Sequence, residues 1–188
     1  MTHFLKEYVK DPRMTGTICP SSKYLAEAMT KINNLQSANV VVELGPGSGA
    51  ITKKIIAKIS KDCTFFALEL NPNLAQELKE KYPNLQVYPD SATNIQKYLQ
   101  KHKVKNCDTV VSSLPWSLLN QETQEKILTE IDASLSPRGK LITYSYLTAK
   151  IMSQQKNFLK LLKQHFPNIQ KRIVWKNIPP AMVYECKK

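Results

Sequence analysis

The sequence predicts an α/β fold in which a mostly parallel sheet of seven strands is covered by helices on both faces. Strand-like apolar runs alternate with amphipathic helical segments, and this order builds a parallel sheet. The first run ends in a glycine-rich turn, as strands do where they deliver backbone to a nucleotide. The last two runs are separated by only a few residues. That spacing is typical of an antiparallel hairpin, which we expect at the edge of the sheet.

The strands before the hairpin are short apolar runs that end at turn residues. They are expected at residues 39–44, 64–69, 85–88, 108–113 and 140–146. The fifth follows Ser-Pro-Arg-Gly at 136–139, which we expect to form a tight turn. The hairpin is expected from strands at 169–175 and 181–186, with a break at 177–180.

The helices are placed by their apolar spacing and by residues that suit a first turn. Ser21 or Ser22 is a candidate N-cap for a helix at 23–32. Asn71-Pro72 opens the helix after the second strand, because proline suits the first helical position. Further helices are expected at 50–59, from about 91 to 101, at 121–135 and at 149–165.

The length and composition indicate a single domain over residues 1–188, enough chain for one substantial core. No apolar run approaches the roughly 20 residues of a membrane-spanning helix, and the N-terminus has no signal-peptide core. The four cysteines are scattered, without metal-ligand spacing. We therefore expect a cytoplasmic protein with reduced thiols and no metal site.

The charge of the chain predicts a partner that carries phosphate groups. The formal net charge is +12, and from Lys150 onward nine basic residues face one acid, Glu185. Such a balance favours nucleic acid or an anionic membrane surface. A lysine-rich solvated face is the alternative.

The glycine-rich turn is the strongest functional signal. Three of the five glycines in the chain, Gly45, Gly47 and Gly49, fall within five positions after the acid Glu43. Glycine takes positive φ and has no Cβ, so the main chain can turn sharply and lie against a ligand. The turn therefore predicts a nucleotide-like ligand at the end of the first strand.

The turn alone fits both NAD and S-adenosylmethionine, since Gly45 to Ala50 also satisfies the loose dinucleotide pattern, with Glu69 at the ribose position. Glu43 favours S-adenosylmethionine, because a carboxylate there would pair with a free α-amino group, which NAD lacks. Asp90-Ser91 is placed to hydrogen-bond an adenine amino group. The closing hairpin leaves no second nucleotide-binding half.

On these residues the chain resembles the class I S-adenosylmethionine-dependent methyltransferases, of Rossmann-like fold, from about residue 17 to the end. The resemblance implies S-adenosylmethionine as cofactor and S-adenosylhomocysteine as product. It places Glu43, Gly45 and Gly47 around the methionine part, Glu69 on the ribose and Asp90 near the adenine. The full set of candidate cofactor residues is Glu43, Gly45, Gly47, Gly49, Glu69, Leu70, Asp90, Ser91 and Ser112.

The acceptor site is expected where Ser112-Ser-Leu-Pro-Trp116 ends the fourth strand. This stretch is similar to the Asn-Leu-Pro-Tyr type motif of rRNA adenine dimethyltransferases, with Ser113 in place of the amide. A closer resemblance is to the bacterial phospholipid N-methyltransferases, which methylate phosphatidylethanolamine towards phosphatidylcholine. It extends through blocks at 4–13, 16–23, 42–49, 112–116 and 175–184.

The candidate catalytic residues are Ser113, Trp116 and Tyr146. An amine acceptor needs desolvation and in-line positioning more than a strong base. Methylation ends in a quaternary ammonium, which an aromatic such as Trp116 would hold by cation–π attraction. Tyr146 ends the fifth strand, where it would face the same pocket. Packing in the core is the alternative role for both rings.

The N-terminal segment 1–16 is expected to act as membrane anchor and partial lid through an amphipathic helix at 3–10, although docking on the core is the alternative. The candidate residues for the lipid phosphate or the membrane are Phe4, Lys6, Tyr8, Arg13 and Lys23. The expected partners are a phospholipid and an anionic membrane surface, without nucleic acid. We expect a monomer on the inner face of the cytoplasmic membrane.

Two other functions remain open. One is an RNA or small-molecule methyltransferase that uses the basic C-terminal face. The other is a non-catalytic protein that binds S-adenosylmethionine or lipid.

Overall fold

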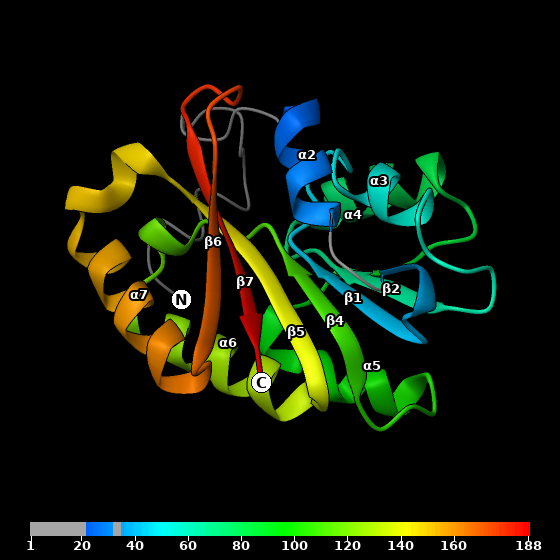
Figure 1. The fold of residues 1–188 in the computed structure, drawn as a ribbon. Coiled ribbons are helices and arrows are strands. Elements are labelled where there is room, and N and C mark those ends of the chain that lie inside the picture. Colours follow the sequence, from blue (N-terminus) through cyan, green and yellow to red (C-terminus); the bar gives the residue numbers. More distant parts are fainter. Residues whose placement is uncertain (1–21, 32–34) are drawn as a thin grey trace.

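The fold is a seven-stranded sheet in the order β3-β2-β1-β4-β5-β7-β6, and the computed structural model describes residues 22–31 and 35–188 (Figure 1). β1 to β5 are parallel, whereas β7 is antiparallel to both β5 and β6. The predicted fold class and the edge hairpin are confirmed. The strands are β1 (Val40–Leu44), β2 (Thr64–Leu68), β3 (Gln86–Tyr88), β4 (Cys107–Ser112), β5 (Leu135–Tyr146), β6 (Asn168–Val174) and β7 (Ala181–Lys187).

Helices cover both faces of the sheet, as predicted. Side chains alternate along β1, so Val41 packs with α2 and α3 while Val42 packs with α5, α6 and α7. Residues of α4 pack on β2 and β3 in a third cluster. The helices are α2 (Lys23–Thr30), α3 (Thr52–Ile56), α4 (Pro72–Lys81), α5 (Ile95–Lys101), α6 (Gln121–Ser134) and α7 (Ser153–His165).

The predicted helix starts are confirmed at two caps. The Ser22 hydroxyl accepts a hydrogen bond from the backbone N–H of Leu25 at 3.2 Å and begins α2. The Asn71 side chain accepts from the next turn of α4, with Pro72 at the first helical position. Each cap satisfies an N–H that the helix itself leaves without a partner.

The prediction of a tight turn at 136–139 is wrong, because these residues lie inside β5. Cys107 of β4 pairs with Leu135, and Thr109 pairs with Lys140, so the segment is an irregularity within the strand. The chain still bends closely there, since a Cβ on Gly139 would lie 2.9 Å from the Ser136 carbonyl oxygen. The turn residues therefore mark a bulge rather than the start of the strand.

Two predicted helices are shorter than expected. The segment 149–165 is divided into a 3₁₀ helix, η4 (Leu147–Ile151), and α7, because Met152 has an extended backbone. Instead of 50–59, α3 spans Thr52–Ile56, and beyond it Lys58 donates to the Ile55 carbonyl in a tighter turn.

The anchor segment 1–16 lies outside the described residues, together with Phe4, Lys6, Tyr8 and Arg13. Within 22–31 and 35–188, no helix is long and apolar enough to span a bilayer.

Replacing Gly49 by alanine is expected to lower the free energy of unfolding by about 2–3 kcal/mol. Gly49 has φ +80°, and its Cβ would lie 2.5 Å from Leu78 Cδ1 of α4. Gly47→Ala is the matched control, because Gly47 also has positive φ but nothing within 4 Å of a Cβ. Urea unfolding of both variants measures the difference, and equal losses would contradict the packing role of Gly49.

Candidate functional site

The candidate site lies at the carboxyl ends of β1 and β4, where the chain order reverses. β2 is on one side of β1 and β4 is on the other, so the loops leaving these strands diverge. Backbone hydrogen bonds fix the loops at their origins. Gly45 N–H donates to the Leu68 carbonyl at 2.9 Å, and Ser113 N–H donates to the Leu44 carbonyl at 2.8 Å.

The three glycines of the loop have positive φ, as predicted, but their surroundings differ. The φ values are 67° for Gly45, 55° for Gly47 and 80° for Gly49. A Cβ on Gly45 would lie 3.0 Å from Leu114 Cδ2, beyond the end of β4. Gly47 is open, while Gly49 is pressed against α4. Gly49 thus allows the loop to pack, and the open side of the loop is at Gly47.

Glu43 is a fully buried carboxylate beneath this loop. Thr52 Oγ1 donates to its Oε2 at 2.7 Å, while its Oε1 has no hydrogen-bond partner among the described residues. Burial raises the pKa of Glu43 to about 8, with the nearby charge of Glu69 acting in the same direction. An incompletely satisfied buried carboxylate is costly unless a ligand completes it. Glu43 therefore fits a role in binding a cationic group.

Glu69 lies at the end of β2 and holds the glycine loop from the other side. Gly47 N–H donates to its Oε2 at 3.0 Å, and Asn71 N–H donates to its Oε1 at 3.0 Å. Burial raises the pKa of Glu69 above its usual value, although these hydrogen bonds oppose the change. A carboxylate has further lone pairs, so Glu69 keeps acceptor capacity for ligand hydroxyls.

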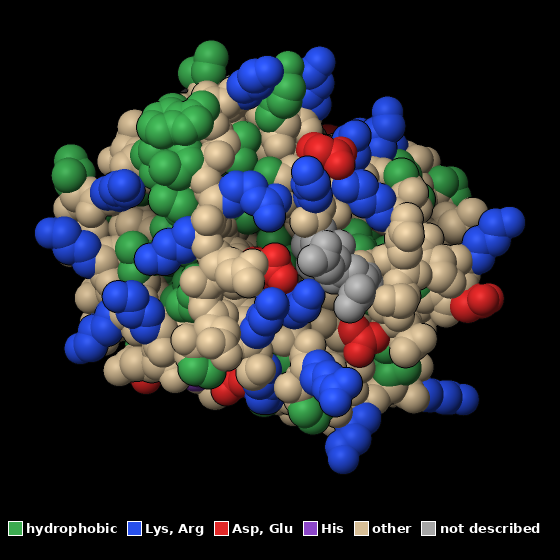
Figure 2. Space-filling view, in the orientation of Figure 1, with side chains coloured by type: hydrophobic (Ala, Val, Ile, Leu, Met, Phe, Trp, Pro, Cys, Tyr) green, Lys and Arg blue, Asp and Glu red, His purple; other side chains and the backbone are tan. Residues whose placement is uncertain are grey.

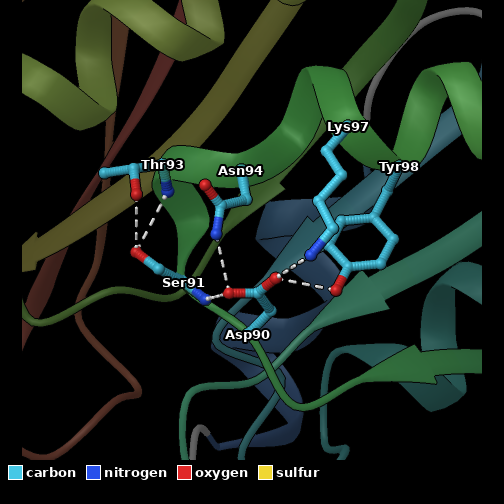
Figure 3. A network of polar contacts seen from close by, with 6 residues as sticks. All are labelled: Asp90, Ser91, Thr93, Asn94, Lys97 and Tyr98. Atoms are coloured by element: carbon cyan, nitrogen blue, oxygen red, sulfur yellow. Dashed lines mark hydrogen bonds and ion pairs between the residues drawn. The ribbon is translucent and has the colours of Figure 1, made fainter.

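Asp90, after β3, is the centre of a polar network (Figure 3). It accepts hydrogen bonds from the Ser91 backbone, Asn94, Lys97 and Tyr98, at 2.7 to 3.0 Å. Partial burial acts to raise its pKa, but the four donors hold the pKa of Asp90 well below its ordinary value. The network keeps the carboxylate ionised and oriented at the start of η2 (Ala92–Asn94) and α5.

A pocket brings five of the nine predicted cofactor residues together. Its lining includes Gly45, Glu69, Leu70, Asp90 and Ser91. Four predicted residues, Glu43, Gly47, Gly49 and Ser112, lie outside the lining. The remaining walls are mostly apolar and were not predicted from the sequence; they include Ala92, Leu118, Leu119 and Ile127. These residues come from η2, from η3 (Trp116–Leu118) and the residue after it, and from α6, and only the fold brings them together.

A second pocket adjoins the first and contains the three predicted catalytic residues. It is lined by Ser113, Trp116 and Tyr146, together with Tyr144. Four residues line both pockets: Ser113, Leu114, Pro115 and Leu118. The Ser113 hydroxyl is buried and has no hydrogen-bond partner among the described residues. Ser113 thus lies at the junction between the first pocket, predicted to hold the cofactor, and the second, predicted to be the acceptor pocket.

The structure favours core packing, the alternative role, for Trp116. The side chain is 1% exposed, its ring stacks on Phe158 at 4.5 Å, and its Nε1–H donates to Thr143 Oγ1 at 2.7 Å. A ring committed to the core in this way offers no free face to a cation. Gln124 Nε2 donates to the Trp116 carbonyl at 2.7 Å and so holds the loop from α6. Trp116 and Gln124 therefore position the loop that carries Ser113.

Lys23, predicted to contact phosphate or membrane, lies outside both pockets. Its ammonium is 5.3 Å from the centre of the Tyr24 ring, and Lys176 approaches the same ring at 5.3 Å. The first turn of α2 and the β6–β7 turn thus present two cations beside one aromatic ring.

The first pocket fits S-adenosylmethionine. Glu69 has capacity for the ribose hydroxyls, and the apolar walls suit adenine. Glu43, whose buried Oε1 has no described hydrogen-bond partner, lies outside the lining of this pocket. Within the described ranges, no three His, Cys, Asp or Glu side chains gather as metal ligands.

The model of the family described as ribosomal RNA adenine dimethylase matches residues 13–177. The chain belongs to this family. With the fold and the pocket, membership makes the chain an S-adenosylmethionine-dependent N-methyltransferase of class I architecture. NodS, an N-methyltransferase from Bradyrhizobium japonicum WM9, matches with a TM-score of 0.67 at 12% identity, covering 88% of this chain and 96% of NodS. The likeness to NodS shows the fold alone.

Two curated relatives differ in how much of the chain they match. An ornithine lipid N-methyltransferase from Singulisphaera acidiphila is 28% identical over 98% of this chain and 94% of its own length. A ribosomal RNA small subunit methyltransferase A from Thermotoga petrophila is 28% identical over 66% of this chain. The match spans 46% of that methyltransferase, less than half its length.

Glu43→Gln is expected to remove a pH dependence of stability. The folded pKa of about 8 lies above the usual value of 4.5, so the wild-type protein binds an extra proton when folded. The contribution of Glu43 to stability is therefore greatest below about pH 4.5 and falls as the pH rises to about 8, by about 2–5 kcal/mol. Urea unfolding without cofactor across this range measures the effect.

The glutamine variant should show a flatter profile than the wild type, whereas parallel profiles would contradict the raised pKa of Glu43. The same variant is expected to bind S-adenosylmethionine at least about tenfold more weakly by calorimetry, because it loses a charge-assisted contact. Unchanged affinity would remove Glu43 from the cofactor site.

Proposed function

We propose that this protein transfers methyl groups to the amine head group of a membrane phospholipid, namely phosphatidylethanolamine and its methylated intermediates on the way to phosphatidylcholine. The observation that carries the proposal is the match along 98% of this chain to an ornithine lipid N-methyltransferase, which also modifies a lipid nitrogen. The rRNA relative matches a smaller part of the chain.

The junction at Ser113 supports amine chemistry. When bound, S-adenosylmethionine supplies a sulfonium methyl that passes to the nitrogen lone pair and leaves S-adenosylhomocysteine. The buried Ser113 hydroxyl has no other partner among the described residues, so it is available to accept an N–H of the amine. Apolar walls from Leu114 and Pro115 exclude water from the nucleophile. Positioning and desolvation then supply most of the rate.

The aromatic rings of the second pocket are suited to hold the positive charge of the ammonium group that forms after each methyl transfer. Tyr144 and Tyr146 lie edge to face at 5.6 Å between ring centres, and both line the pocket. Tyr146 takes over the role predicted for Trp116, since a tyrosine face attracts a methylated ammonium. The phosphodiester would be met by cations, for which Lys6 and Arg13 stay predictions and Lys23 is an exposed candidate.

Membrane attachment is part of the proposal, because the substrate is held in a bilayer. The segment 1–16, with Phe4 and Tyr8, is proposed as anchor and lid on the cytoplasmic face of the membrane.

Methylation of adenine in RNA is a second candidate, favoured by the family model. Ser113 stands where the rRNA enzymes carry an amide, and a hydroxyl has fewer donors and acceptors for a base edge. This substitution favours the lipid.

The deciding experiment incubates the protein with methyl-labelled cofactor and separate acceptors. Phosphatidylethanolamine, its monomethylated form, ornithine lipid, rRNA and free ethanolamine are compared, and the lipids are resolved by thin-layer chromatography. Label in phosphatidylethanolamine products is the expected result. Label confined to rRNA or to ornithine lipid would refute the phospholipid assignment, and no label with any acceptor would support a non-catalytic binder.

Tyr146→Leu is expected to lower kcat/KM for the dimethylated lipid by roughly threefold to thirtyfold, the size of one cation–π contact. Tyr146→Phe is the matched control and should retain most of the activity, because it keeps the ring. Initial rates with dispersed lipid measure both. Equal losses in the two variants would assign the effect to the hydroxyl rather than to the aromatic face.

A further inference from the structure

Three large apolar side chains protrude from the part of the protein that the structure describes. Trp175 is 69% exposed, Ile178 is 84% exposed and Ile151 is 85% exposed. Trp175 and Ile178 lie in the turn between β6 and β7, and Ile151 ends η4, which follows β5. All three therefore lie beyond the carboxyl end of β5.

Hydrogen bonds hold these segments side by side. Leu147 N–H at the start of η4 donates to the Pro180 carbonyl at 2.8 Å. On the other side, Ser22 N–H at the start of α2 donates to Asn177 Oδ1 at 3.2 Å, and Asn177 Nδ2 donates to the Pro179 carbonyl at 2.7 Å. Figure 1 shows the turn projecting past the sheet, with α2 beside it.

Trp175 and Ile178 are exposed in a β6–β7 turn that hydrogen bonds of Asn177 hold in place. Asn177, between the two protruding residues, is only 2% exposed and holds the turn from within. A rigid turn that points Trp175 and Ile178 outward places apolar area in water at a cost, which contact with an apolar phase removes.

Lysines are sequence neighbours of two of these apolar side chains, Lys176 of Trp175 and Lys150 of Ile151. Lys23 and Lys176 flank the Tyr24 ring. Figure 2 shows hydrophobic and basic side chains together at the upper left, where Figure 1 places the β6–β7 turn.

Acids are scarce in the sequence around this surface. No acid occurs between Asp132 and Glu185, whereas nine lysines and arginines do. Glu185 is paired with Lys140 at 3.3 Å. On α2, Glu27 is paired with Lys54 and Lys58. The positive charge therefore complements an anionic surface.

The protruding residues are close to the acceptor pocket. Tyr146, which lines that pocket, directly precedes η4 and pairs with Ala181 at the end of the turn. A lipid lifted slightly from a bilayer at this surface would have its head group beside Tyr146.

We propose that Trp175, Ile178 and Ile151, together with Lys23, Lys150 and Lys176, form a docking surface that inserts shallowly into an anionic phospholipid bilayer. Tryptophan suits the boundary between head groups and acyl chains, and lysines beside it attract anionic lipids. The aliphatic isoleucines favour a bilayer over RNA, because they offer no flat ring for base stacking. The docking surface rests on the proposed function, since a lipid substrate requires the acceptor pocket to face the membrane.

The test measures co-sedimentation with vesicles of phosphatidylglycerol and phosphatidylcholine, in which no phosphatidylethanolamine is present. The full chain should bind, less at high salt. Trp175→Ala/Ile178→Ala should bind at least about tenfold more weakly, because the bilayer loses the two apolar contacts. Ile56→Ala is the matched control, since Ile56 is an exposed isoleucine on α3 (40%) and should leave binding unchanged.

Fluorescence provides a readout that does not need a weakened variant. The chain has two tryptophans, and Trp116 is buried. The emission of the wild type should shift to shorter wavelength when these vesicles are added, whereas Trp175→Phe, which retains Trp116, should show no shift. Melting temperature and S-adenosylmethionine affinity equal to the wild type establish that each variant is folded.

Unchanged vesicle binding by the double variant overturns the docking surface. An equal loss of vesicle binding by Ile56→Ala also overturns it, and so does a wild-type protein that does not bind vesicles. Loss of RNA binding instead of vesicle binding by the double variant also overturns it. The proposed function is judged separately. Vesicle binding through these residues without methylation of phosphatidylethanolamine would leave the surface standing and refute the function. Equal methylation of detergent-dispersed lipid by wild type and double variant, with vesicle binding lost only in the variant, supports both.

Discussion

The site depends on one constraint, the reversal of strand order at β1. β2 and β4 flank β1, so the loops that leave β1 and β4 diverge and open a crevice at the carboxyl edge. The hydrogen bonds from Gly45 to Leu68 and from Ser113 to Leu44 hold the loops at that edge. The two pockets meet at Ser113 because it directly follows the end of β4.

Two buried carboxylates beneath the glycine loop have different roles. Both oxygens of Glu69 accept backbone N–H groups, so its charge is partly compensated within the chain. Glu43 has only the Thr52 hydroxyl at Oε2, and its other oxygen has no described partner. Burial raises the pKa of both carboxyl groups, to about 8 for Glu43, and a cationic group beside Glu43 would lower its pKa.

The aromatic residues around the second pocket are of two kinds: some pack in the core, and others line the pocket. Trp116 and Phe158 stack in the core and fix the loop after β4, whereas Tyr144 and Tyr146 line the pocket. β5, which supplies the two tyrosines, continues into η4. Residues 140–146 of β5 pair with β7. The pocket, η4 and the β6–β7 turn are therefore joined along one edge of the sheet, with the exposed surface beside the pocket.

The sequence by itself determined the alternation of strands and helices, the three positive-φ glycines, and the acids at the ends of the first three strands, because these depend on local backbone preference and periodicity. It also indicated the caps at Ser22 and Asn71. It misjudged 136–139, where pairing with β4 turned a local turn signal into a bulge. Only the tertiary structure decided that Trp116 is buried, that Gly49 packs on α4, and that Ala92, Leu119 and Ile127 form pocket walls. Burial and pocket shape arise from contacts between distant segments, and no local pattern encodes which segments will meet.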